Sequence, residues 1–442
     1  MPRQPSTPQQ AQIRRNVTLA ERLQPKLAEL VGERDGISSG SSSSSFPGFQ
    51  YVVVSQEKVM FSYSGGRRNV AEDRPVSEGT RFMMASTSKA LTSIAALQMI
   101  EDGTLKLDES VSTYYPDHPY GRALTIRHLL MQTSGIANPP PCWFHSLEEH
   151  AMFDEEAALQ RVMENHPRLL FPPGFKYSYS NIASWLLQAA MERQADLDFP
   201  SLMKTRILDK LGIPESELGF IFPVADAPKV AKGYIRRWSL VDCCKRWMLE
   251  RWMWDKYEGS KSKWLSLSPF YLDGPGYGGA IATARGVSKV LQDLLQSESR
   301  LFTDPATKDL LFTRGKSSYG HKIPMSLGLA TGSLQGERWY GKPGGGPGYS
   351  CSLRLYPDMG FATVWMGNNT LTSHSEFKLM DSGYDAQQMC LQFFKFINDD
   401  LAFWLSGYLA IWLFQPNPEW SAVRAHGWQF GYQALQLYLG FL

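Results

Sequence analysis

One apolar segment constrains the fold of this 442-residue chain more than any other feature. It covers residues 90–100 and stops at Gly103, which predicts a buried helix with a glycine at its C-terminal end. A shorter apolar run, residues 82–85, leads into it as a strand end or loop. Ser86 and Lys89 stand between the two runs, three residues apart and therefore on one helix face. Because an unpaired buried hydroxyl or amine is costly, this pair needs a reason to be there.

The spacing of this pair is weak evidence by itself, because the same Ser-x-x-Lys pattern recurs along the chain. Elsewhere we interpret it as two exposed polar residues. The other matches are Ser55/Lys58, Ser201/Lys204, Ser260/Lys263 and Ser375/Lys378. Ser86 differs because it heads a long apolar segment, where unpaired N–H groups and the helix dipole favour developing negative charge. We therefore take Ser86 as the candidate nucleophile and Lys89 as the first candidate base.

The charge and cysteine content exclude several classes of function. The formal net charge of +2 gives no bulk electrostatic case for binding nucleic acid or an anionic membrane. Five scattered cysteines show no metal-ligand spacing, so we expect reduced thiols and neither a metal nor a cofactor. They are Cys142, Cys243, Cys244, Cys351 and Cys390. Residues 1–16 are polar and unlike a secretory signal, so a cytoplasmic location is expected.

Three regions follow from the pattern of the chain. Residues 1–47 read as an N-terminal arm with a Ser/Gly linker, 48–398 as one domain, and 399–442 as an apolar aromatic tail. Strands at both ends of the middle region, with helices between them, predict an α/β (α+β) fold. We expect an antiparallel sheet flanked by helices, with a mostly helical insert at about 120–270.

The predicted elements are set by apolar periodicity and turn residues. The predicted strands are 49–55, 59–64, 325–330, 337–340, 350–356 and 360–366. The predicted helices are 125–132, 154–164, 180–193, 200–211, 284–296 and 385–398. Residues 238–264 place five tryptophans among Lys and Arg. We interpret them first as a core-facing amphipathic helix, and second as a lid over an apolar substrate or a membrane-touching patch.

The tail carries an uncharged aromatic run at 401–414, which is too short to span a bilayer. It predicts a buried or interfacial helix, because such a run exposed to water is an association surface. We therefore expect the tail to pack on the body, or to give weak membrane contact or self-association. We do not expect it to supply catalytic groups.

A second polar motif, Tyr179-Ser180-Asn181, follows a turn-rich stretch and precedes a predicted helix. In extended geometry Tyr179 and Asn181 point the same way, so a phenol and a carboxamide can enter one cleft together. The tyrosine can pass a proton to or from a reacting group, and the amide can bind a substrate carbonyl and the Lys89 amine. The alternative is an N-capping Ser180 beside a packed tyrosine.

A third motif begins at Lys342 and continues through a glycine-rich run beside predicted strands. Glycines allow close approach of a substrate, and a backbone N–H of Gly344 or Gly345 can complete an oxyanion hole with that of Ser86. Lys342 supplies a second positive charge. A lysine amine titrates near ~10.4, so it serves as a base at neutral pH only where burial or a neighbouring cation lowers its pKa.

The three motifs occur in the order found in the serine β-lactamase and penicillin-binding-protein-like superfamily. The chain resembles its class C-like branch, which includes carboxylesterases, D-aminopeptidases and fungal transesterases. Further matching positions lie within about residues 48–398. They include Gly103, Leu105, Leu107, Asp108, Val111, Tyr115, Pro116, Thr125–Leu130, Thr133–Ile136 and Gly278–Thr283. The resemblance implies a β-lactamase/transpeptidase-like fold, with Ser86, Lys89 and Tyr179 as catalytic residues and Asn181, Lys342, Gly344 and Gly345 as substrate-binding residues.

Two positions depart from that family pattern. Gln132 stands where the family often has His, and Pro343 follows Lys342 where the family often has a residue with a hydroxyl. Pro343 has neither a hydroxyl nor an N–H, which weakens the case for binding a β-lactam carboxylate.

The motifs together predict a serine hydrolase or acyltransferase that forms an acyl-enzyme on Ser86. The expected partner is a small, fairly apolar ester or thioester, with either water or an alcohol as the acceptor. A first alternative is hydrolysis of a β-lactam, a peptide or a D-amino-acid amide. A second is a catalytically inactive family member that acts as a binding or structural module.

Overall fold

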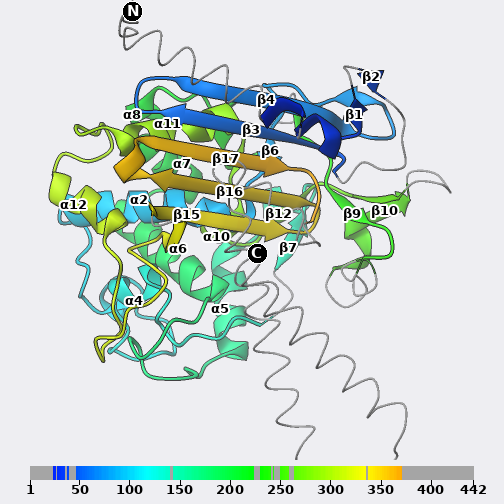
Figure 1. Cartoon of the computed structure of the whole chain (residues 1–442). Helices are drawn as coiled ribbons and strands as arrows, with labels where there is room; N and C mark the ends of the chain where they lie inside the picture. Colours follow the sequence, from blue (N-terminus) through cyan, green and yellow to red (C-terminus); the bar gives the residue numbers. More distant parts are fainter. Residues whose placement is uncertain are drawn as a thin grey trace, which may run out of the picture.

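A seven-stranded antiparallel sheet carries the fold and joins the two ends of the described chain (Figure 1). The computed structural model describes residues 23–25, 27–34, 37–38, 46–139, 143–222, 229–239, 242, 249–257, 263–334 and 337–370. In spatial order the strands are β14 (Ala330–Leu334), β15 (Glu337–Gly346), β16 (Tyr349–Tyr356), β17 (Phe361–Gly367), β3 (Gly48–Ser55), β4 (Val59–Asn69) and β5 (Arg74–Pro75). The predicted fold class is thus confirmed.

The inner strand β3 is buried on both faces, which explains its nearly continuous apolar sequence. Val52 and Val54 belong to the main core. The alternate side chains face a second cluster, in which the Phe49 ring stacks on Trp365 of β17 at 4.2 Å. Leu23 and Leu27 pack into this second cluster. The sheet therefore has apolar cover on each side, and β3 and β17 are tied together by packing as well as by hydrogen bonds.

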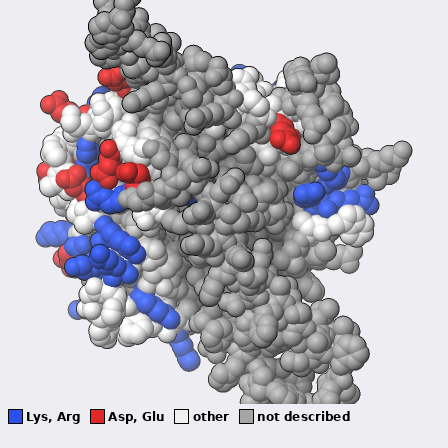
Figure 2. Space-filling model, viewed as in Figure 1, with Lys and Arg blue, Asp and Glu red and all other residues white. Residues whose placement is uncertain are grey.

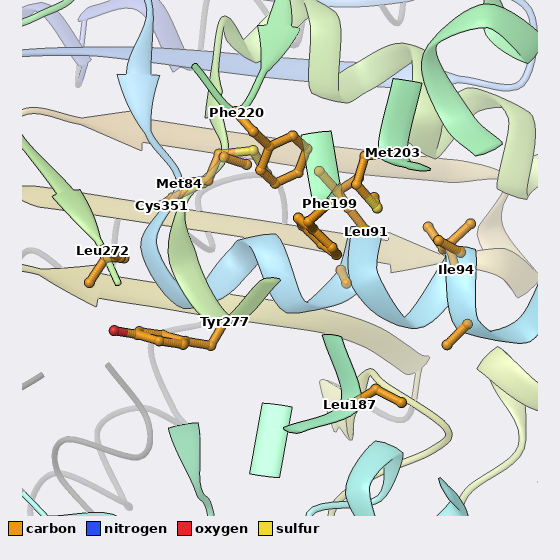
Figure 3. Packing of buried hydrophobic residues seen from close by; sticks show 14 of the residues in the cluster. Met84, Leu91, Ile94, Leu187, Phe199, Met203, Phe220, Leu272, Tyr277 and Cys351 are labelled. Atoms are coloured by element: carbon orange, nitrogen blue, oxygen red, sulfur yellow. The ribbon is translucent and has the colours of Figure 1, made fainter. Parts of the chain in front are cut away.

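Helices cover the sheet and fill the body beside it (Figure 1). They are α2 (Ser88–Glu101), α3 (Val111–Tyr114), α4 (Ile126–Leu130), α5 (Glu155–Asn165), α6 (Asn181–Ala195), α7 (Phe199–Met203), α8 (Asp209–Leu211), α10 (Pro275–Gly278), α11 (Ala284–Leu295) and α12 (Pro305–Asp309). Helix α2 is the predicted buried helix, with every residue from Ser88 to Met99 buried. Figure 3 shows Leu91 and Ile94 of α2 packed among side chains from other elements.

Short strands and turns complete the body. The strands are β1 (Glu33–Arg34), β2 (Ile37–Ser38), β6 (Phe82–Met83), β7 (Phe144–Ser146), β8 (Leu218–Gly219), β9 (Tyr234–Arg236), β10 (Trp254–Tyr257), β11 (Trp264–Leu267), β12 (Phe270–Leu272) and β13 (Ile281–Ala282). Helical turns lie at η1 (Ala85–Thr87), η2 (His150–Met152), η3 (Lys204–Leu208), η5 (Arg251–Met253), η6 (Leu310–Phe312) and η7 (Pro357–Met359). The second half of the predicted insert therefore carries short strands where helix was expected.

The prediction of a helix over 238–264 is wrong for the described part of that segment. β10 and β11 pair as antiparallel strands, and Trp264 is buried within β11. Trp238 instead lies in a turn with its side chain 80% exposed, and the Arg237 guanidinium lies 5.5 Å from its ring centre. Figure 2 shows Lys and Arg side chains gathered beside this small sheet. Pairing between distant segments overrides the local helical pattern here.

Two other predicted elements differ in extent. The predicted helix 200–211 is divided into α7, the π-helical turn η3 and α8. The predicted strand 325–330 is a turn, in which Gly328 has a φ of 107° and Ser326 bonds to Leu329, so β14 begins only at Ala330. The predicted helix 385–398, the tail 399–442 and all cysteines except Cys351 lie outside the described residues. Among the helices that the structure describes, none combines the length and the apolar character needed to cross a bilayer.

Candidate active site

Ser86 lies in the 3₁₀ turn η1, between β6 and α2. It therefore precedes the first turn of the helix, where the sequence had placed it. The turn is anchored on both sides. The Met84 N–H donates to the Ala280 carbonyl at 2.8 Å, and the Ser88 hydroxyl accepts the Ala280 N–H at 3.0 Å. Ala85 has a φ of 45°, which is uncommon for a residue with a side chain. Backbone strain of this kind persists only where the surroundings hold it, as they do here.

The Lys89 amine lies at the centre of the candidate site and is only 4% exposed. It donates to Ser86 Oγ at 3.3 Å, to Asn181 Oδ1 at 2.8 Å and to the Tyr277 carbonyl at 2.7 Å. These three acceptors come from η1, α6 and α10, so packing of separate elements fixes the amine. These three hydrogen bonds offset the cost of burying the Lys89 amine, which is why the residue can be buried here.

Tyr179 and Asn181 lie together beside Ser86 and Lys89, as predicted. The phenolic oxygen lies 2.6 Å from Ser86 Oγ, and the phenol donates to Asn181 Oδ1 at 3.0 Å. With its one proton donated in that bond, the phenolic oxygen can accept a hydrogen bond from the Ser86 hydroxyl. The alternative role of Ser180 also holds, because its hydroxyl accepts the Ala183 N–H at 3.1 Å and caps α6. Ser180 therefore caps the helix, and the same turn holds Tyr179 and Asn181 beside Ser86.

Lys342 extends from β15 to the Tyr179 ring. Its Nζ lies 4.8 Å from the centre of the Tyr179 ring, and Lys89 Nζ lies 4.8 Å from the same centre. Cations near an aromatic ring are attracted to it, more strongly when the site excludes water. Burial lowers the pKa of Lys342 to about 8, so its charge is lost within an accessible pH range.

Gly344 allows β15 to lie directly against η1. A Cβ atom at this position would stand 2.5 Å from the Met84 carbonyl and 2.5 Å from Thr87 Oγ1, so no side chain fits without a shift. The Thr87 hydroxyl also donates to the Lys342 carbonyl at 3.2 Å. Gly345 follows on the same stretch of strand. β14 pairs with β15 only as far as Gly341. Among the described strands, the part of β15 from Lys342 to Gly346 is therefore paired on one side only, with β16.

An apolar pocket opens beside Ser86, with about 360 Å³ of empty space when the open solvent at its mouth is counted. Its walls are largely aromatic and aliphatic, from Met83, Phe144, Phe270, Leu272, Tyr277 and Tyr349. The backbone of Gly345 and Gly346 borders it as well. None of the described residues that line it is charged.

The other Ser-x-x-Lys pairs that the structure describes are surface features. Lys204 pairs with Asp209 at 2.8 Å, and the Ser55 hydroxyl bonds to the backbone carbonyl of Lys58. Ser260 and Ser375 lie outside the described residues. Cys351 is a free thiol beneath η1, and burial raises its pKa to about 12.

Sequence reasoning missed the residues that hold the site together. The Tyr277 carbonyl is one, and backbone groups leave no signature in a sequence. Gln132 is another: its Oε1 accepts the Ser180 N–H at 2.6 Å and its Nε2 donates to Ser184 Oγ at 3.1 Å. Asn138 Oδ1 similarly accepts the Asn181 N–H at 2.9 Å. The only hint of this role in the sequence was the departure from the family pattern at position 132. In the structure, Gln132 holds the backbone of Ser180, the residue after Tyr179.

We expect Gln132→Ala to reduce kcat roughly 10-fold and to leave KM little changed. The change leaves the buried Ser180 N–H without its acceptor, which costs about 1–3 kcal/mol of stability and releases the Tyr179 loop. Steady-state kinetics with thermal melting measures both effects. Gln160→Ala is the matched control, because Gln160 bonds to Tyr115 and makes no contact with the site motifs. Equal kcat values in the two variants would contradict this role of Gln132.

Comparison with known proteins identifies the family of this chain. The family model described as Beta-lactamase matches residues 23–381. Penicillin-binding protein 4* of Bacillus subtilis is 24% identical over 327 residues, which cover 72% of this chain and 68% of that protein. Beta-lactamase-like protein 2 of Dictyostelium discoideum is 24% identical over 221 residues, which cover 48% of this chain and 39% of that protein.

Solved structures of low identity share the fold. One is described as EstCE1, a hydrolase with promiscuous acyltransferase activity; it has a TM-score of 0.63 at 19% identity and covers 83% of this chain and 99% of its own. D-alanine carboxypeptidase AmpC from Burkholderia cenocepacia has a TM-score of 0.59 at 17% identity and covers 84% and 98%. The family match supports a serine hydrolase in general. Because the family model spans most of the chain, this protein belongs to the Beta-lactamase family, within the serine β-lactamase and penicillin-binding-protein-like superfamily.

Proposed function

We propose that this protein is a serine hydrolase or acyltransferase that forms an acyl-enzyme on Ser86 from a small, fairly apolar ester or thioester. One observation carries the proposal. Ser86 Oγ lies within reach of both a phenol, at 2.6 Å, and a buried amine, at 3.3 Å. A weak nucleophile needs such a neighbour to accept its proton.

In the proposed acylation, the Tyr179–Lys89 pair is one proton short, as a phenolate beside the ammonium or a phenol beside the neutral amine. Ser86 Oγ attacks the carbonyl carbon while its proton passes to this pair. The carbonyl oxygen becomes an oxyanion, which the backbone N–H groups of Ser86 and Gly344 or Gly345 stabilise. The bond to the leaving alcohol or thiol then breaks, and Tyr179 returns the proton to that group. Asn181 orients the substrate carbonyl and the Lys89 amine, and Lys342 keeps positive charge beside the phenol.

In the proposed deacylation, water or an alcohol takes the place of the leaving group. It gives its proton to Tyr179 and attacks the acyl carbon, and Ser86 Oγ recovers a proton as the acyl bond breaks. Water completes a hydrolysis, and an alcohol completes a transesterification. Both use the same residues, so the acceptor alone decides the product.

Cleavage of β-lactams or D-amino-acid amides is the second candidate, and the names of the relatives favour it. Against it, Pro343 offers no hydroxyl or N–H to a substrate carboxylate. The pocket beside Ser86 has no charged residue among its described lining either. An inactive family member is the third candidate, and the close contacts of Ser86 argue against it.

Covalent labelling tests the proposal directly. We expect a fluorophosphonate probe to modify Ser86 in the purified full-length protein, as mass spectrometry of the labelled peptide would show. Parallel assays with a chromogenic ester, a thioester and a penicillin should rank the esters first. Faster turnover of the penicillin would favour the second candidate. If neither an adduct nor turnover is detected, the remaining candidate is a catalytically inactive binding or structural module.

A further inference from the structure

The apolar pocket lies on one side of the nucleophile. Its lining includes Ser86 and Asn181, but not Tyr179, Lys89 or Lys342. In the proposed reaction Tyr179 protonates the leaving group, so the leaving group departs on the tyrosine side. The acyl group bonded to Ser86 Oγ must then extend the other way, into the pocket. This step rests on the proposed function.

Two short strands form one wall of the pocket. β7 and β12 pair antiparallel, with Phe144 opposite Leu272 and Ser146 opposite Phe270. Side chains alternate between the two faces of paired strands, so Phe144, Phe270 and Leu272 share the face that lines the pocket. The Phe144 and Phe270 rings meet edge to face at 5.1 Å. The wall therefore closes the pocket with packed rings.

The opposite face of this wall is fixed by its own contacts. His145 stacks on Phe153 at 3.8 Å, and its Nδ1 lies 2.9 Å from Asp273 Oδ1. His150 stacks on Tyr271 at 3.7 Å and bonds to His145 at 2.9 Å. A wall whose opposite face is packed in this way cannot yield to a longer substrate without losing these contacts.

We infer that the β7–β12 wall sets the acyl specificity, and that the substrates are esters of uncharged acyl groups of short to medium length. The described lining is apolar and uncharged, and the packed rings of the wall limit how far an acyl chain can enter. Each methylene of the acyl chain gains from burial until the chain meets Phe144 and Phe270. A carboxylate on the acyl group is excluded, because desolvating it in an uncharged pocket is costly.

A series of p-nitrophenyl esters tests this inference on the full-length protein. We expect kcat/KM to rise from acetate to butyrate or hexanoate and to fall again by decanoate. A hemisuccinate ester, which matches butyrate in length but carries a charge, should be at least about 10-fold poorer than butyrate.

Variants of the wall should move the optimum in opposite directions. Phe144→Ala or Phe270→Ala should raise the decanoate-to-butyrate ratio of kcat/KM roughly 10-fold or more. Gly346→Ala should lower that ratio, because a Cβ there meets only Ala85 Cβ, at 3.5 Å, and narrows the pocket without a clash. If a phenylalanine variant fails to fold, the other one tests the wall, and Gly346→Ala, on β15, still tests whether the acyl chain enters this pocket.

Phe220→Ala is the matched control. Phe220 forms a similar edge-to-face pair with Phe199, at 5.2 Å, and does not line the pocket. Figure 3 shows this pair together, away from Leu272. The control should lose stability and keep the chain-length profile. If the esters are turned over but the chain-length profile is the same in all pocket variants, or if hemisuccinate is the best substrate, this inference is wrong and the proposed function still stands. No ester turnover and no label on Ser86 would overturn the proposed function with it.

Discussion

Ser86→Ala is expected to lower ester turnover roughly 10⁴-fold or more, as loss of a catalytic nucleophile does in other serine enzymes. It should also abolish the covalent adduct that mass spectrometry detects. The fold should survive, because Lys89 keeps its bonds to Asn181 and to the Tyr277 carbonyl. A thermal melt close to that of the wild type would separate lost chemistry from lost structure.

The control for this variant lies within the chain. Ser201→Ala removes a serine from the same Ser-x-x-Lys spacing, but its lysine, Lys204, pairs with Asp209 at the surface. Turnover and labelling should be unaffected. An adduct that persists in Ser86→Ala, or that maps to Ser201, would show that the nucleophile is assigned to the wrong residue.

Lys342→Met is expected to lower the rate roughly 10²-fold and to shift the pH–rate profile. With one cation fewer beside Tyr179, the protonated form of the proton-accepting pair is favoured, so the lower limb of the profile should move to higher pH. Burial lowers the pKa of Lys342 to about 8, so its charge is present below that pH and lost above it. A decline that the wild type shows as pH rises through about 8 should therefore be absent from the variant.

Lys342→Arg provides the opposite case, because a guanidinium keeps its charge at high pH. Any decline near pH 8 should move upward while the lower limb stays in place. Lys176→Met is the matched control, since Lys176 Nζ also lies over a ring, that of Phe171 at 5.1 Å, outside the site. An unshifted Lys342→Met profile with only a raised KM would make Lys342 a substrate anchor.

Local patterns predicted the elements that carry the site. The apolar run behind Ser86 became α2, and Tyr179-Ser180-Asn181 became the approach and first residue of α6. The segment 238–264 misled, because its Trp and Lys spacing suits a helix while the described strands depend on distant partners. Trp264 pairs with Arg236, and no short window of sequence contains that contact.

The sequence by itself determined which residue types carry the chemistry and their order along the chain. Ser86 and Lys89 are placed on one face through spacing alone, whereas the close approach of β15 to η1, which leaves room only for a glycine at 344, is a tertiary contact. Only the tertiary structure decided that Tyr179, 93 residues from Ser86, would lie 2.6 Å from its hydroxyl. It also brought the Tyr277 carbonyl to Lys89 and set the β7–β12 wall against the pocket. Such contacts arise because packing of a whole core, and not any local preference, fixes the positions of distant side chains.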